Sequence, residues 1–159
     1  MKNLNLGCGE DYKKGWINLD SRRNIKSDIR WDLNSLPYPF KKMEFDNVLL
    51  SHVLEHVNDP VKVLKEVIRI SKENAKVTVI VPHANSYASN SDLQHKGRFT
   101  ENTFTKEHLK EYELENLVLV RKSFLFTNSL RKMIPFKRFF KIFLNGIYED
   151  ISFEFKVER

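Results

Sequence analysis

A short apolar segment that runs into a glycine turn limits the folds open to this chain. In residues 3–9, Leu4 and Leu6 supply the apolar positions, and Gly7 and Gly9 end the segment. A buried parallel strand followed at once by a turn has this pattern. Glycine adopts positive φ without strain and lets a ligand approach the backbone closely. Because ligands bind at the carboxyl ends of strands in open α/β sheets, the segment predicts a strand that opens onto a ligand site.

Further strand-like segments follow in order along the chain. Alternating or β-branched apolar residues predict strands, and apolar residues at three- and four-residue steps predict helices. The expected strands cover residues 16–20, 29–33, 45–52, 76–81, 117–126 and 151–157, and the expected helices cover 60–73 and 105–113. A long polar loop is expected over residues 82–100, and loops of this length are usually functional.

The motifs LNLGCG, INLD, WDLNSLPYPF and FDNVLLSHVLEHV occur in this order near the start of the chain. Over residues 3–108 the sequence resembles the class I S-adenosylmethionine (SAM)-dependent methyltransferases of the methyltransferase-11 type. The chain length suits a single domain over residues 1–159, and the resemblance implies that this domain is Rossmann-like α/β. Its seven-stranded sheet would be mostly parallel with the last strand antiparallel, in a three-layer sandwich. Residues 10–15 are too few for the usual crossover helix, so reduced helices are expected after the first two strands.

The resemblance also implies a set of cofactor-binding residues at the ends of the strands. Asp20 corresponds to the carboxylate that accepts hydrogen bonds from both ribose hydroxyls, and Asp32 and Leu33 correspond to the adenine contact. The other expected contacts are Asn5, Gly7, Cys8, Gly9, Ser51 and His52. Asn5 departs from the family, which often has an acid there. The implied cofactor is SAM, with S-adenosylhomocysteine (SAH) as its product.

Two residues of the 82–100 loop are candidates for a catalytic role. Related proteins often carry an Asp-x-x-His here, which Asp92 and His95 reproduce. Histidine titrates near neutral pH, so His95 could take a proton from a hydroxyl or amine nucleophile. The alternative is that His95 only braces the loop through Asp92.

Residues 52–56 spell H-x-x-E-H, which also occurs in inverted zinc proteases. On a helix this spacing would place His52 and His56 on one face. A zinc site needs a third protein ligand, and the segment follows a strand rather than lying on a helical scaffold. We therefore expect no metal at His52 and His56.

Charge and cysteine content give predictions for the basic segment, for disulfide bonds and for the location of the protein in the cell. The net charge is +6, and no acidic residue lies between Asn116 and Tyr148. Within that basic stretch, residues 129–147 predict an amphipathic lid-like insertion. Cys8 is the only cysteine, so an internal disulfide is excluded, and the chain starts directly with a strand. These features predict a cytoplasmic protein without a signal peptide.

The combined prediction is a SAM-dependent methyltransferase acting on a small molecule or on a glycan or sugar-nucleotide acceptor, and anionic acceptors are included in this prediction. One alternative is a non-catalytic module that binds SAM or another nucleoside. The other is a nucleic-acid methyltransferase using the basic segment, which is disfavoured because no Asp/Asn-Pro-Pro-Tyr motif follows the fourth strand. A membrane surface is a less favoured partner, and a homodimer is left open.

Overall fold

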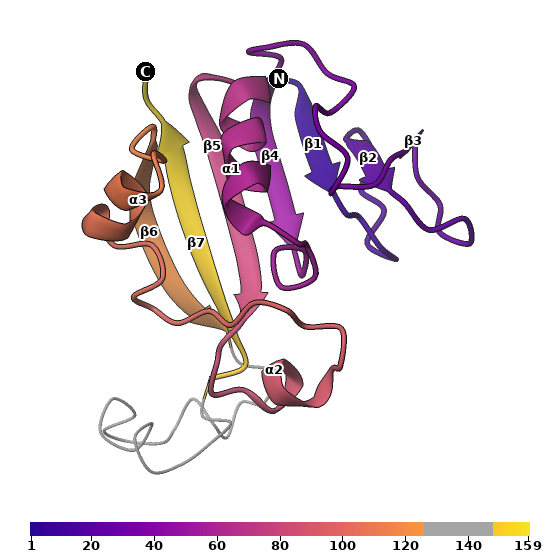
Figure 1. Ribbon diagram of the computed structural model, residues 1–159. Coiled ribbons are helices and arrows are strands. Elements are labelled where there is room, and N and C mark those ends of the chain that lie inside the picture. The colour runs from indigo at the N-terminus through magenta and orange to yellow at the C-terminus, as the bar shows by residue number, and fades with distance from the viewer. Residues whose placement is uncertain (126–147) are drawn as a thin grey trace.

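The protein is described by a computed structural model over residues 1–125 and 148–159. The sheet has seven strands in the order β3-β2-β1-β4-β5-β7-β6 (Figure 1). Strands β1 to β5 pair in parallel, whereas β7 pairs antiparallel with both β5 and β6. The expected Rossmann-like α/β fold with an antiparallel last strand is confirmed. The basic segment 129–147 lies outside the described residues.

The strands agree with the sequence pattern in position and differ from it in length. They are β1 (Asn3–Leu6), β2 (Ile17–Asp20), β3 (Ile29–Arg30), β4 (Phe45–Ser51), β5 (Ser71–Pro82), β6 (Leu117–Leu125) and β7 (Asp150–Val157). β3 is shorter than expected because the Asp32 carboxylate accepts a hydrogen bond from the Asn34 N–H at 2.9 Å and turns the chain.

Helix α1 (Pro60–Ile70) begins as its sequence predicts. Asp59 caps it by accepting a hydrogen bond from the Lys62 N–H, and Pro60 occupies the first turn. The helix ends at Ile70, earlier than residue 73, because Ser71 is extended and pairs with Phe45 of β4. The helix packs its apolar face on the sheet through buried residues that include Val63, Leu64, Val67 and Ile70.

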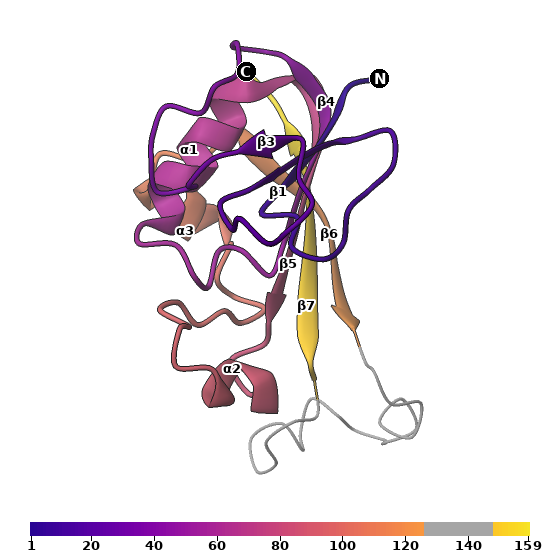
Figure 2. The same cartoon turned by 90° about the vertical axis from the view of Figure 1, so that its right-hand side faces the viewer.

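Two shorter helices complete the described elements. Helix α2 (Tyr87–Ser91) lies within the long loop after β5, and α3 (Lys106–Glu111) starts at the Thr105 cap. Figure 2 shows α1, α2 and α3 on the same side of the sheet, with the link between β1 and β2 on the other side. None of the helices within residues 1–125 and 148–159 combines the length and apolar character needed to cross a membrane.

The link between β1 and β2 has no helix, as expected, and buried amides hold it in place. Asn18 is fully buried, and its side-chain oxygen accepts hydrogen bonds from the Asn5 side chain and the Lys13 N–H. Its side-chain nitrogen donates to the carbonyls of Lys13 and Trp16 and to the Asp28 carboxylate. These bonds satisfy backbone groups that a helix would otherwise have satisfied.

Candidate functional site

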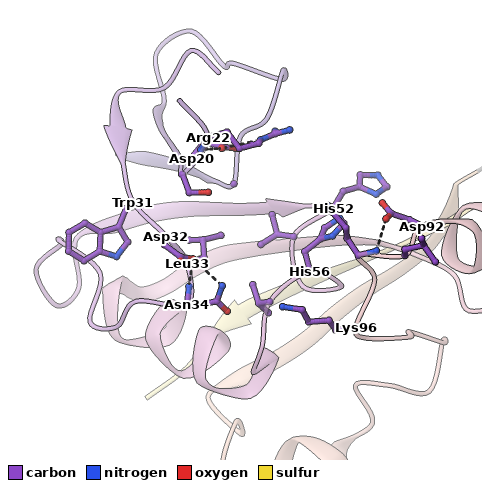
Figure 3. A pocket seen from close by; sticks show the side chains of 16 residues that line it. Asp20, Arg22, Trp31, Asp32, Leu33, Asn34, His52, His56, Asp92 and Lys96 are labelled. Atoms are coloured by element: carbon purple, nitrogen blue, oxygen red, sulfur yellow. Dashed lines mark hydrogen bonds and ion pairs between the residues drawn. The ribbon is translucent and has the colours of Figure 1, made fainter. Parts of the chain in front are cut away.

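A cavity of about 660 Å³ opens at the carboxyl ends of the parallel strands. It is lined by Gly7, Asp20, Ser21, Arg22, Trp31, Asp32, Leu33, Asn34, His52, Val53, His56, Val57, Asp92, Leu93, Gln94 and Lys96. In Figure 3, Trp31, Asp32 and Leu33 lie at one end, and His52, His56 and Asp92 lie at the other. Asp20 and Arg22 lie along one side between them. This edge of an open α/β sheet is where ligands bind.

Gly7 forms the cavity wall where β1 ends. Its φ is +67°, and a Cβ atom there would lie 2.6 Å from Cγ2 of Val53. Any other residue would therefore be strained and would clash with the turn that follows β4. The glycine lets the ends of β1 and β4 approach each other beneath the cavity.

Asp20 presents an ionised carboxylate at the end of β2. One carboxylate oxygen accepts a hydrogen bond from the Gly9 N–H, and the other accepts one from the Arg22 N–H, both at 2.9 Å. Burial alone would raise the pKa of Asp20, but these two backbone bonds and the Arg22 side chain lower it below its usual range. The carboxylate thus stays charged at neutral pH and oriented at the cavity.

The opposite wall is formed by the segment that follows β3. Leu33 is 9% exposed, so its side chain is largely buried below the cavity. Asp32 is exposed, and the Trp31 indole N–H donates to the Ser35 carbonyl at 2.7 Å. An apolar side chain beside an indole and a polar backbone turn suits a flat aromatic ligand with hydrogen-bonding edges.

Four of the expected cofactor contacts, Asn5, Cys8, Gly9 and Ser51, do not line the cavity. Asn5 is 2% exposed and donates to the Asp11 carbonyl and to Asn18, so it lies behind the glycine turn. Gly9 contributes through its N–H, which holds Asp20.

Cys8 has the character of a packed core residue. The thiol is buried, and burial raises its pKa, with the negative charge of Asp20 adding to the shift. Reactive thiols need a lowered pKa, so this one is not activated as a nucleophile.

His52 lies at the boundary between the cofactor-sized cavity and a second one. The residue adopts φ +54°, an uncommon conformation for a side chain of this size. Its Nδ1 lies 3.4 Å from the Glu55 carboxylate, and its Nε2 lies 3.7 Å from that of Asp150. The contact with Glu55 raises the pKa of His52, which burial opposes and Asp150 reinforces.

The second cavity brings His95 and Asp92 to the site. It adjoins the first and shares His52, His56, Asp92, Leu93 and Gln94 with it. Its remaining lining residues are Glu55, Pro82, Ala88, Ser91 and His95. His95 is 9% exposed, and its Nε2 lies 3.6 Å from the Asp92 carboxylate. The pair predicted from the sequence is therefore adjacent in space and lies at the end of the site away from Trp31.

The sequence interpretation missed Arg22, Trp31 and Lys96 as cavity residues. Arg22 follows Asp20 by two positions, and its side chain also donates to that carboxylate at 3.3 Å. Trp31 directly precedes the expected adenine contact. Arg22 and Trp31 could therefore have been predicted from their sequence neighbours, which are expected cofactor contacts. The position of Lys96 depends on how the long loop folds back and could not have been predicted in this way.

Comparison with known proteins agrees with this geometry. Residues 4–79 match the family model of the methyltransferase domain. The chain has the fold of the SAM-dependent methyltransferases. A crystal structure of a SAM-dependent methyltransferase from Archaeoglobus fulgidus superposes with a TM-score of 0.71, at 18% identity over 98% of this chain and 85% of that one. One from Mesorhizobium loti superposes with a TM-score of 0.69, at 12% identity over 98% of this chain and 90% of that one.

A curated relative extends the comparison in sequence. An uncharacterised protein of Methanocaldococcus jannaschii is 30% identical over 86 residues, which cover 54% of this chain. This chain therefore spans less than half the length of that curated relative, 40% of it. A chain from the complex between the Haloferax volcanii Trm112 methyltransferase activator and a methyltransferase superposes with a TM-score of 0.67, at 14% identity over 99% of this chain and 83% of that one.

Proposed function

We propose that this protein is a SAM-dependent methyltransferase. The observation that carries the proposal is the meeting of Gly7, Asp20, Asp32 and Leu33 in one cavity at the carboxyl edge of the sheet. These four positions come from three strand ends, and each is a position to which the family resemblance assigns a cofactor contact. The matched methyltransferase family model over residues 4–79 supports the same conclusion.

The residues of this cavity fit a nucleoside. Asp20 is charged, already oriented by the Gly9 and Arg22 N–H groups, and suited to accept hydrogen bonds from the two hydroxyls of a ribose. The segment Trp31–Leu33 offers an indole, an apolar side chain and a backbone turn for the adenine. This arrangement leaves the end near His52 and His56 for the methionine part of SAM.

The acceptor is proposed to bind in the second cavity. SAM supplies an electrophilic methyl group when bound, so the chain itself has to align a nucleophile with that group and exclude competing water. His52, His56 and Asp92 line both cavities, which places them where the two ligands would meet. His95 and Asp92 are the proposed acceptor-activating pair.

The lining favours an acceptor rich in hydroxyl groups, such as a sugar, a glycan end or a sugar nucleotide. Imidazole, carboxylate and amide groups from His52, Asp92 and Gln94 supply both donors and acceptors of hydrogen bonds around the shared boundary. Lys96 lines the first cavity and not the second, so its cation would face the cofactor rather than the acceptor. This acceptor class is the finer part of the proposal.

Calorimetry with SAM and SAH tests the cofactor assignment directly. We expect saturable binding of both, near one ligand per chain. Absence of binding by either would overturn the proposal. Transfer of a radiolabelled methyl group from SAM to a panel of sugars and sugar nucleotides then tests the acceptor class. Binding without transfer to any member would support the alternative of a non-catalytic SAM-binding module.

A further inference from the structure

Three side chains that can ligate a metal gather at the wall of the second cavity. Glu55 and His56 lie in the turn after β4, and His95 lies in the long loop after β5. One potential ligand atom from each residue lies within 4.8 Å of the other two. The rings of His56 and His95 meet edge to face, with centroids 4.7 Å apart. The fold thus brings the imidazole of His95 next to the carboxylate and imidazole of two neighbouring residues, Glu55 and His56.

Glu55 is buried in a way that calls for a cation. The residue is 1% exposed, and neither carboxylate oxygen has a hydrogen-bond partner among the described residues. The Nδ1 of His52 lies 3.4 Å from one oxygen and forms an ion pair with Glu55 when His52 is protonated, but this contact leaves both oxygens without a hydrogen bond. A buried carboxylate without hydrogen bonds is costly unless it is paired with a charge or coordinates a metal. One of its oxygens lies within 4.8 Å of a ring nitrogen of His56 and of His95.

The two ring nitrogens of His95 have different surroundings. Its Nδ1 is buried and has no hydrogen-bond partner in the described part of the chain. Its other nitrogen, Nε2, lies on the side of the Asp92 carboxylate at 3.6 Å. Metal-ligating histidines commonly present one ring nitrogen to the ion and direct the other toward a carboxylate. Asp92 would then orient His95 without touching the ion.

We propose that Glu55, His56 and His95 bind a divalent first-row metal ion, Zn²⁺ in the first instance. Two imidazoles and one carboxylate form a ligand set that Zn²⁺ uses in sites that keep a fourth position open. Small side-chain rotations would bring the three atoms to about 2.0–2.2 Å from the ion. The open position faces the second cavity, which all three residues line.

This site differs from the one that the H-x-x-E-H spacing suggests. Residues 53–56 form a turn rather than a helix, so His52 and His56 are not presented together on a helical face. The third ligand is His95, which the fold brings from 39 positions beyond His56 along the chain. His52 lies outside the cluster and remains at the boundary of the two cavities, so the proposal replaces the expectation of no metal for His56 and keeps it for His52.

The metal site would specify how the acceptor is activated, and this role rests on the proposed methyltransferase function. A hydroxyl group bound at the open position of the ion would have a lowered pKa, because the ion stabilises the oxygen anion, and its proton would pass to bulk water. His95 would then act through the ion instead of taking the proton itself. Metal binding as such does not depend on methyl transfer and is tested without it.

The test is metal retention by the full chain purified without a histidine tag. We expect protein incubated with Zn²⁺ and then dialysed to keep about one equivalent by elemental analysis, and calorimetry with Zn²⁺ alone to show one site. The variants Glu55→Gln and His95→Ala should lose the bound Zn²⁺. The control His108→Ala, at an exposed histidine on α3, should retain it. Retention that survives Glu55→Gln and His95→Ala, or no retention by the parent, would overturn the proposal.

The variant Asp92→Asn tests the Zn²⁺ site even if Glu55→Gln or His95→Ala fails to fold. Its carboxylate is 45% exposed, so the substitution should leave the circular dichroism spectrum unchanged. Loss of this orienting group should weaken Zn²⁺ binding about 10- to 100-fold. An unchanged affinity would contradict the proposed site. Titration with SAH separates the two proposals, because His95 does not line the first cavity and its substitution should leave SAH binding intact.

Discussion

At the scale of single residues, Asp20 shows how the backbone prepares a charge for a ligand. Three hydrogen bonds from Gly9 and Arg22 hold the carboxylate while the residue as a whole is 5% exposed. Buried charges are tolerated when they are hydrogen-bonded in this way. Because the donors are mostly backbone groups, the orientation of the carboxylate follows from the turn after β1 and needs no ligand.

Replacing Asp20 by Ala should weaken SAM binding by about 1.5–3 kcal/mol, the usual cost of losing a charged hydrogen bond. Calorimetry with SAM measures the change. Glu73→Ala is the matched control, because Glu73 is an exposed carboxylate outside the cavity and its loss should leave affinity unchanged. Equal affinity of Asp20→Ala and the parent would show that the β2 carboxylate does not hold the ribose.

The residue scale also shows which site residues a sequence can reveal. Asp20, Asp32 and Gly7 are visible because each directly follows a strand-like segment, and strand ends meet at one edge of a parallel sheet. The role of Asn5 in holding the link behind the cavity was not visible, because its partners Asp11 and Asn18 depend on how residues 10–16 fold back. The nearness of His95 to Glu55 likewise depends on the path of a loop that has no periodic pattern.

At the scale of elements, the helix-free link after β1 depends on Asn18. The side chain of this one residue makes hydrogen bonds to Asn5, Lys13, Trp16 and Asp28. Its sequence position inside a short apolar strand gives no sign of this function. The sequence therefore predicted the missing helix from the length of the link but not the amide network that replaces it.

Asn18→Ala should lower the free energy of unfolding by about 1–3 kcal/mol, because buried donors and acceptors of the link would lose their partner. Urea denaturation followed by circular dichroism measures this change. Asn24→Ala, at an exposed asparagine in the next link, should stay within about 0.5 kcal/mol of the parent. Similar stability for both variants would mean that the link is held by other contacts.

Helix α1 is tied to the preceding loop by the hydrogen bonds of a partly buried ion pair, Glu66 and Arg69. Glu66 accepts hydrogen bonds from the Arg69 guanidinium and from the Tyr38 N–H at 2.6 Å. Arg69 in turn donates to the carbonyls of Tyr38 and Phe40. Helical spacing alone predicts that these two charged residues lie on solvent-exposed faces of the helix. In the structure they contact the loop instead, and Glu66 is buried.

The ion pair makes stability depend on pH. Burial would raise the pKa of Glu66, but hydrogen bonds from Arg69 and Tyr38 lower it below the usual glutamate value of about 4.3. A carboxyl group with a lowered pKa in the folded state stabilises the fold above its unfolded pKa, and this contribution is lost as pH falls through the folded pKa. Thermal melts of the parent should therefore drop more between about pH 5 and pH 3 than those of Glu66→Gln. Equal drops would contradict this linkage.

At the scale of the whole molecule, β7 joins the parallel part of the sheet to β6. Phe153 in β7 is fully buried, and its ring meets that of Phe104 edge to face at 4.9 Å. Core residues such as Leu6, Leu50 and Val79 belong to the same hydrophobic cluster. One continuous core thus extends under both halves of the sheet, as the alternating apolar pattern of each strand predicts.

Phe153→Ala should reduce the free energy of unfolding by about 3–5 kcal/mol through the cavity it leaves. Denaturation should remain a single transition, because the cluster spans the sheet. Val118→Ala, at a 39% exposed position on β6, should change stability by about 0.5 kcal/mol or less. A first transition confined to β6 and β7 would show instead that these strands unfold separately.

The place of β7 between β5 and β6 also has a consequence during translation. β6 pairs only with β7 among the described strands, and the far edge of β5 stays unpaired until residues 150–157 leave the ribosome. A nascent chain that has already formed β1 to β5 therefore displays a long open strand edge, the kind of surface on which chains aggregate. The edge of β5 is covered only when β7 has been synthesised, so pauses between the synthesis of β5 and that of β7 should be more harmful than pauses before β5.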